Sequence, residues 1–120
     1  MKKKGVISEN YLARIPIRRD TMKWSVEADG KVTLEIENRG VFHWIAQKLF
    51  LKPKISYVHL DEMGSFIWSL LDGEKSIMDL GKEVKETFGE DAYPLYERLA
   101  KYFQILDSYG FIDWKKALYQ

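Results

Sequence analysis

The sequence predicts one small α+β domain, in which a three-stranded antiparallel sheet is followed by a bundle of three helices. Two runs of alternating apolar and polar residues flank Asp29-Gly30, a pattern typical of a β-hairpin. Three amphipathic segments with helix start and stop signals follow in the second half of the chain. A length of 120 residues favours a single domain, and strands segregated from helices are typical of the α+β class.

Three regions are expected along the chain. Residues 1–20 are predicted to be a flexible basic arm that is extended around Pro16, because proline disfavours a helical conformation in the residue before it. Residues 21–114 are predicted to form the single domain, and residues 115–120 a C-terminal tail.

The predicted sheet contains three strands. The first two cover residues 22–28 and 31–37, where apolar and polar side chains alternate on each side of the turn. Residues 55–60 are expected to be the third strand, because they are rich in β-branched and aromatic residues. An extra amphipathic helix is predicted as an insertion before this strand, over residues 39–52, where apolar residues recur at helical spacing: Val41, Trp44, Ile45 and Leu49.

The three predicted helices each have a start signal. Their N-caps are expected at Asp61, Ser76 and Asp91, and Ser76 also begins a capping-box pattern. Each helix is expected to end at a glycine-containing turn. Their inward faces carry apolar residues at helical spacing: Met63, Phe66, Ile67, Leu70 and Leu71 in the first, Ile77, Leu80, Val84 and Phe88 in the second, and Leu95, Leu99, Phe103 and Leu106 in the third.

Composition argues against catalysis, metal binding and export. The chain has no cysteine, which excludes disulfides and thiolate zinc sites. Its two histidines, His43 and His59, belong to different predicted elements, so neither a metal site nor a cofactor is expected. The basic N-terminus lacks the apolar core of a signal peptide, and no apolar run reaches the roughly 18 residues that span a membrane. We therefore expect a cytoplasmic protein that is not an enzyme.

Charge is distributed unevenly along the chain. Residues 1–60 contain 12 Lys and Arg against 6 Asp and Glu, whereas residues 61–120 contain 7 against 12. Three helices with small strands fit a winged-helix DNA reader, but such a reader needs a basic recognition helix. The second and third predicted helices mix both signs, so nucleic-acid binding is not favoured. A winged-helix DNA-binding transcriptional regulator remains the alternative function, and membrane contact through the basic insertion is a weaker one.

Residues 64–73 read Gly-x-x-Ile-Trp-x-x-Leu-Asp-Gly. This core is similar to that of the PqqD-like family, also called precursor-peptide or RiPP recognition elements. The similarity covers roughly residues 22–37 and 55–114, while the insertion at 38–54 and the arm at 1–20 depart from the family pattern. Further matching positions are mostly apolar: Leu60, Asp61, Ile77, Leu80, Phe88, Phe103, Leu106, Gly110, Phe111 and Ile112.

The resemblance implies a winged-helix peptide-binding module without catalytic activity. Such a module acts as a chaperone for the leader of a ribosomally made precursor peptide, which it presents to a modifying enzyme, often a radical S-adenosylmethionine protein. In similar proteins the leader adds as a strand to the edge of the third strand and lies against the third helix. For Leu99 and Phe103, a purely structural role in the core is an equal alternative. The peptide-binding residues implied by the resemblance are Ser56, Tyr57, Val58, His59 and Leu60 in the strand, and Tyr96, Leu99 and Phe103 in the helix.

Overall fold

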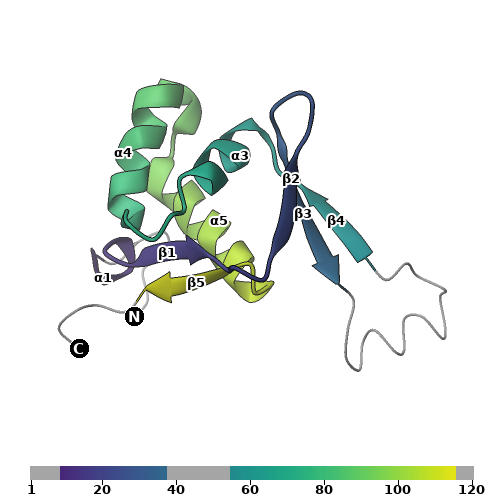
Figure 1. The fold of residues 1–120 in the computed structure, drawn as a ribbon. Coiled ribbons are helices and arrows are strands. Elements are labelled where there is room, and N and C mark those ends of the chain that lie inside the picture. The colour runs from purple at the N-terminus through teal and green to yellow at the C-terminus, as the bar shows by residue number, and fades with distance from the viewer. Residues whose placement is uncertain (1–8, 38–54, 116–120) are drawn as a thin grey trace. The chain divides into compact units, whose positions relative to one another are not determined.

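The computed structural model describes residues 9–37 and 55–115 (Figure 1). The chain divides into two compact units: a sheet unit, Thr21–Ser65, and a helical unit formed by Met1–Asp20 together with Phe66–Gln120. The elements follow in this order: α1 (Glu9–Leu12), β1 (Ile15–Arg18), β2 (Lys23–Val26), β3 (Val32–Glu37), β4 (Ile55–His59), α3 (Glu62–Ser69), α4 (Ile77–Phe88), the 3-10 helix η1 (Gly89–Ala92), α5 (Leu95–Ser108) and β5 (Ile112–Lys115).

The sheet unit is built around an antiparallel sheet in the order β2-β3-β4. Asp29-Gly30 makes the turn between β2 and β3. Gly30 has a φ of 87°, a conformation that residues with a Cβ rarely adopt, and the Asp29 carboxylate accepts a hydrogen bond from the Lys31 amide at 3.0 Å. The predicted hairpin and the predicted third strand are therefore confirmed.

The register of this sheet separates an apolar face from a polar face. Trp24, Leu34 and Val58 are aligned in one row across the three strands, while Thr33 and His59 are paired in the next row. Successive side chains of a strand point to opposite faces, so these two rows lie on opposite sides of the sheet. Strand β4 consequently presents Val58 on the apolar face and His59 on the polar face.

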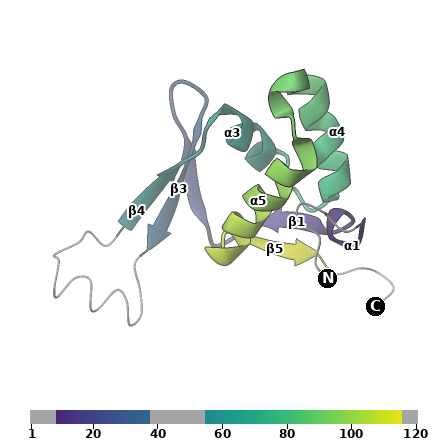
Figure 2. The same cartoon turned by 180° about the vertical axis from the view of Figure 1, so that it is seen from behind.

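In the helical unit, strand β1 is bonded on both of its sides. It pairs antiparallel with β5, with Ile15 opposite Lys115 and Arg18 opposite Ile112 (Figure 2). On its other side, the Arg18 amide donates to the Leu71 carbonyl at 3.3 Å. The strand thus ties the turn after α3 to the C-terminal strand.

The prediction of a flexible arm is wrong for residues 9–18, which form α1 and β1. The extended conformation predicted around Pro16 is confirmed, but its pairing with β5 was not predicted. That partner strand lies at the other end of the described chain, and a local pattern carries no information about so distant a partner. The domain boundaries at residues 21 and 114 stay a prediction.

Two of the three predicted N-caps are confirmed. The Asp61 carboxylate accepts a hydrogen bond from the Gly64 amide at 2.7 Å, at the start of α3. At the start of α4, the Ser76 hydroxyl accepts from the Asp79 amide at 3.1 Å, and the Asp79 carboxylate accepts from the Ser76 amide at 3.3 Å. This reciprocal pair is a capping box.

The predicted N-cap at Asp91 is wrong. Asp91 lies within η1, and α5 begins at Leu95, directly after Pro94 and without a side-chain cap. Proline disfavours the helical conformation in the residue before it, and Tyr93 is extended with a ψ of 139°, so no helix runs from Asp91 into α5. The Asp91 carbonyl instead accepts a hydrogen bond from the Arg98 guanidinium at 2.6 Å.

The α+β class with small antiparallel sheets and several helices is confirmed. The strand arrangement differs from the prediction, because β1 and β5 form a second, two-stranded sheet. The helix predicted over residues 39–52 lies outside the described residues, and the winged-helix arrangement stays a prediction. Among the helices of the described ranges, none has the length and hydrophobicity needed to cross a membrane.

Candidate functional site

Strand β4 lies at the edge of the sheet in the sheet unit (Figure 1). In the described part of the chain, β3 pairs with one side of β4 and no strand pairs with the other. Edge strands are commonly protected from further pairing by proline, lysine or a bulge. The sequence Ile-Ser-Tyr-Val-His contains neither proline nor lysine, so this edge is suited to accept another strand.

A single hydrogen bond determines which amides of β4 point outward. The Leu60 amide donates to the Val32 carbonyl at 2.9 Å, so these two residues form a hydrogen-bonded pair. Hydrogen-bonded and non-hydrogen-bonded pairs alternate along an antiparallel ladder. The amide of Val58 therefore points toward β3, whereas the amides of Tyr57 and His59 point toward the open edge.

A side-chain contact supports this assignment independently. The Thr33 hydroxyl and His59 Nδ1 lie 3.0 Å apart, and the two residues are directly opposite in the register. Side chains approach more closely in non-hydrogen-bonded pairs than in hydrogen-bonded ones. Their contact is expected if the His59 amide points away from β3.

Ser65 anchors the end of β4 and was not predicted as a functional residue. Its hydroxyl accepts a hydrogen bond from the Val32 amide at 2.8 Å and donates to the Leu60 carbonyl at 3.4 Å. The hydroxyl thus replaces the second direct bond of the Val32–Leu60 pair. Ser65 is only 6% exposed, and buried hydroxyls require partners, but this burial is visible only in the folded structure.

The predicted strand residues all lie in β4 or directly after it. Tyr57 is 57% exposed and His59 is exposed on the polar face, whereas Ser56, Val58 and Leu60 are half-buried. An added strand would therefore meet a polar surface on one face and a largely apolar surface on the other.

The predicted helix residues lie on α5, in the helical unit. Leu99 is 2% exposed and Phe103 is fully buried, which fits the alternative that they are core residues. The Tyr96 hydroxyl donates to the Met78 sulfur at 3.4 Å. A Cβ placed on Gly81 would lie 2.8 Å from the Tyr96 ring and 3.1 Å from Leu99, so Gly81 lets α4 and α5 approach closely. The role of these residues in peptide binding stays a prediction.

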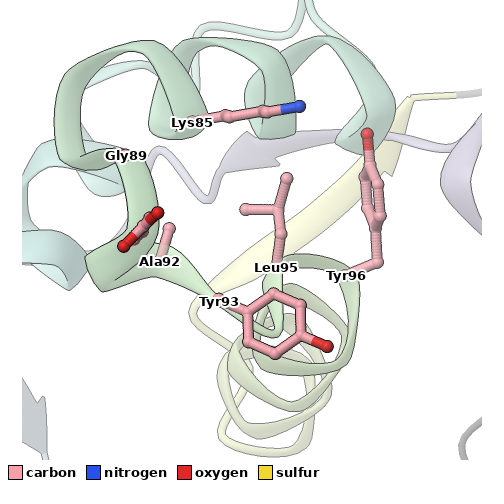
Figure 3. Close-up of a pocket in the computed structure, with 7 residues that line it drawn as sticks. Lys85, Gly89, Ala92, Tyr93, Leu95 and Tyr96 are labelled. Atoms are coloured by element: carbon pink, nitrogen blue, oxygen red, sulfur yellow. The ribbon is translucent and has the colours of Figure 1, made fainter.

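A pocket of about 750 Å³ lies between the end of α4 and the start of α5 (Figure 3). Its volume falls within the range of about 300–1,000 Å³ that is usual for small-molecule sites. Figure 3 shows the Leu95 side chain directed into the pocket, between Lys85 and the ring of Tyr96. Sequence reasoning did not predict this pocket; its lining residues are Lys85, Gly89, Glu90, Ala92, Tyr93, Leu95 and Tyr96.

Shifted pKa values in the helical unit follow from structural contacts. The hydrogen bond from the Arg19 guanidinium, at 2.8 Å, lowers the pKa of Asp113. The pKa of Asp72 is lowered chiefly by the Glu74 amide, which donates to it at 2.9 Å. Burial raises the pKa of Tyr11. In the described ranges, no group of three or more His, Cys, Asp or Glu side chains could hold a metal ion.

Comparison with protein families gives a match over more than half of the chain. The model of the PqqD family, coenzyme PQQ synthesis protein D, matches residues 47–112. The matched segment includes β4 and the helices α3, α4 and α5, while the hairpin of β2 and β3 precedes it. No curated protein and no solved structure matched the chain.

Proposed function

Because the chain belongs to the PqqD family, we propose that it is a non-catalytic peptide-binding adaptor. It captures the leader of a ribosomally made precursor peptide and presents it to a modifying enzyme. The observation that carries this proposal is the open edge of β4, where the outward amides of Tyr57 and His59 are available to an incoming strand. Main-chain hydrogen bonds along such an edge give affinity, and alternate side chains give specificity.

The peptide adds to β4 over Ser56–Leu60. Side chains of the added strand alternate between the apolar face beside Val58 and the polar face beside His59. In the winged-helix arrangement implied by the family, α5 provides the wall of the groove through Tyr96, Leu99 and Phe103. Leu99 and Phe103 are buried within the helical unit, which supports the alternative that these two are core residues.

The partner enzyme is proposed from the family alone. The matching family model is named for a protein of coenzyme PQQ synthesis. Related adaptors serve modifying enzymes such as radical S-adenosylmethionine proteins. On this proposal the chain works in the cytoplasm, where precursor peptides are made.

Hydrogen exchange tests the proposed edge directly. A peptide selected from a displayed library of random sequences of about 12 residues is titrated into the protein. The amides of Tyr57 and His59 should become protected, whereas the Val58 amide, already directed toward β3, should change little. Two versions of the same peptide, N-methylated at one or the other alternate set of residues, should differ, because only one set of amides donates to β4 and only its methylation should lower affinity. Protection without this alternation would contradict strand addition at β4.

The DNA-binding alternative has weaker support from the helix surfaces. Helix α4 carries Lys82 and Lys85 but also Asp79, Glu83 and Glu86. Such a mixed surface does not neutralise phosphates as a basic stripe does. Tight, salt-sensitive binding of random duplex DNA in a mobility-shift titration would favour this alternative over the adaptor.

A further inference from the structure

A buried hydroxyl joins two side chains on the polar face of the sheet. Thr33 is 4% exposed, and its hydroxyl donates to the Glu27 carboxylate at 2.6 Å. The same oxygen lies 3.0 Å from Nδ1 of His59. Glu27, Thr33 and His59 therefore form a short relay that begins beside the hairpin turn and ends at the open edge.

The hydrogen-bond donors and acceptors in this relay determine which ring nitrogen of His59 is protonated. An ionised carboxylate can only accept hydrogen bonds, and a hydroxyl has one proton to donate. Thr33 uses that proton toward Glu27, so its oxygen can only accept from His59. Nδ1 of His59 must therefore carry a proton. In the neutral ring, Nε2 is then an acceptor.

The backbone places this acceptor beside an incoming strand. The His59 amide points toward the open edge, so a residue of an added strand would lie directly opposite His59 with its side chain on the same face. Directly opposite Cβ atoms lie roughly 4.5–5.5 Å apart. The His59 side chain is exposed, and a polar side chain at that position is within reach of its ring.

We propose that His59 determines specificity at the β4 edge: Glu27 and Thr33 hold Nδ1 protonated, so that Nε2 accepts a hydrogen bond from a donor side chain of the bound peptide. This inference rests on the proposed strand addition. The favoured residue opposite His59 is Ser, Thr, Asn or Gln. An acidic residue is disfavoured there, because it offers no donor and Glu27 and Glu35 lie on the same face.

The first test needs no peptide. Long-range proton–nitrogen correlation spectra at about pH 8, above the ordinary titration range of histidine, should show His59 with its proton on Nδ1. Thr33→Val removes the acceptor, and Glu27→Gln introduces an amide that can donate to Thr33. Each change should allow the Nε2-protonated form to appear. A wild-type ring protonated on Nε2 would overturn the inference.

The second test uses a displayed library of random peptides of about 12 residues. Library peptides that bind the wild-type protein but not the Tyr57→Pro variant are selected. Their sequences are aligned at the residue that lies opposite His59. Donor side chains should be enriched there with the wild-type protein and not with His59→Phe. Replacing that donor by alanine should weaken binding to wild type about 3- to 10-fold, the value of one hydrogen bond, and should leave binding to His59→Phe unchanged.

The outcomes separate this inference from the proposed function. If no library peptide depends on Tyr57, strand addition at β4 is wrong. If Tyr57-dependent binders appear without donor enrichment, or with the same enrichment in His59→Phe, strand addition stands and the role of His59 is refuted.

Discussion

The two units of the molecule use their backbone groups differently. In the helical unit, β1 is bonded both to β5 and to the turn after α3, and α4 lies so close to α5 that Gly81 has no room for a side chain. In the sheet unit, β4 is bonded on one side only, and Tyr57 beside the open edge is 57% exposed. The comparison indicates that the helical unit is built for stability, whereas the sheet unit retains hydrogen-bonding capacity for a partner.

The largest expected effect on stability is in α5. Phe103 is fully buried, so Phe103→Ala should lower the free energy of unfolding by about 3–5 kcal/mol. Ile105→Ala on the same helix is the control, because Ile105 is 47% exposed and its truncation should cost far less. Denaturant melts measure both. Equal losses in the free energy of unfolding would contradict the assignment of a core face and a solvent face to α5.

The open edge is expected to respond to proline in an alternating manner. Tyr57→Pro removes an amide donor that points outward, so the protein should remain folded and lose binding of a selected peptide. Val58→Pro removes a donor directed toward β3, so it should destabilise the fold by about 1–3 kcal/mol. Circular dichroism melts and peptide titrations distinguish the two. If both variants fold and bind like wild type, the peptide site lies elsewhere.

Gly81 offers a sharper test of the close helix contact. In Gly81→Ala the new methyl group would meet the ring of Tyr96 at 2.8 Å, and overpacking of this kind typically costs about 1–3 kcal/mol. In a Tyr96→Ala background the same change should cost less, because the ring that the methyl group would meet is absent. Lys82→Ala, on the exposed side of α4, is the control for helix propensity. A fully tolerated Gly81→Ala would show that α4 and α5 separate easily.

The smallest expected effect concerns the ion pair between Arg19 and Asp113. Its hydrogen bond lowers the pKa of Asp113 in the folded state. The stabilisation by this ion pair is present above the ordinary aspartate pKa, about 3.9. It is lost as the pH falls through the lower pKa that Asp113 has in the folded state. Thermal melts should therefore show Asp113→Asn less stable than wild type near neutral pH, with the gap closing below about pH 4. A gap independent of pH would assign the effect to something other than this charge.

Local sequence signals predicted the elements that depend on neighbouring residues. The turn at Asp29-Gly30, the cap at Asp61 and the capping box at Ser76 were all predicted, because each is made by groups within a few residues of one another. The family core at residues 64–73 was also recognised from local residue types, and the family match over residues 47–112 confirms it.

The details of the candidate site could be predicted only in part. The third strand was placed correctly, but which of Tyr57 and Val58 points outward required the bond from Leu60 to Val32. Ser65 and the relay through Thr33 were missed, because their partners lie on other elements. The alternating residue pattern of a strand describes its two faces, and it carries no information about its two edges.

The sequence by itself determined the α+β class, the hairpin, the third strand and the starts of α3 and α4, because turns, caps and amphipathic faces are short-range interactions. Only the tertiary structure decided that β1 pairs with β5, that Gly81 lets α4 and α5 approach closely and that the Thr33 hydroxyl lies 3.0 Å from Nδ1 of His59. Each of these features depends on groups far apart in the chain. Their partners are specified by the folded arrangement rather than by neighbouring residues.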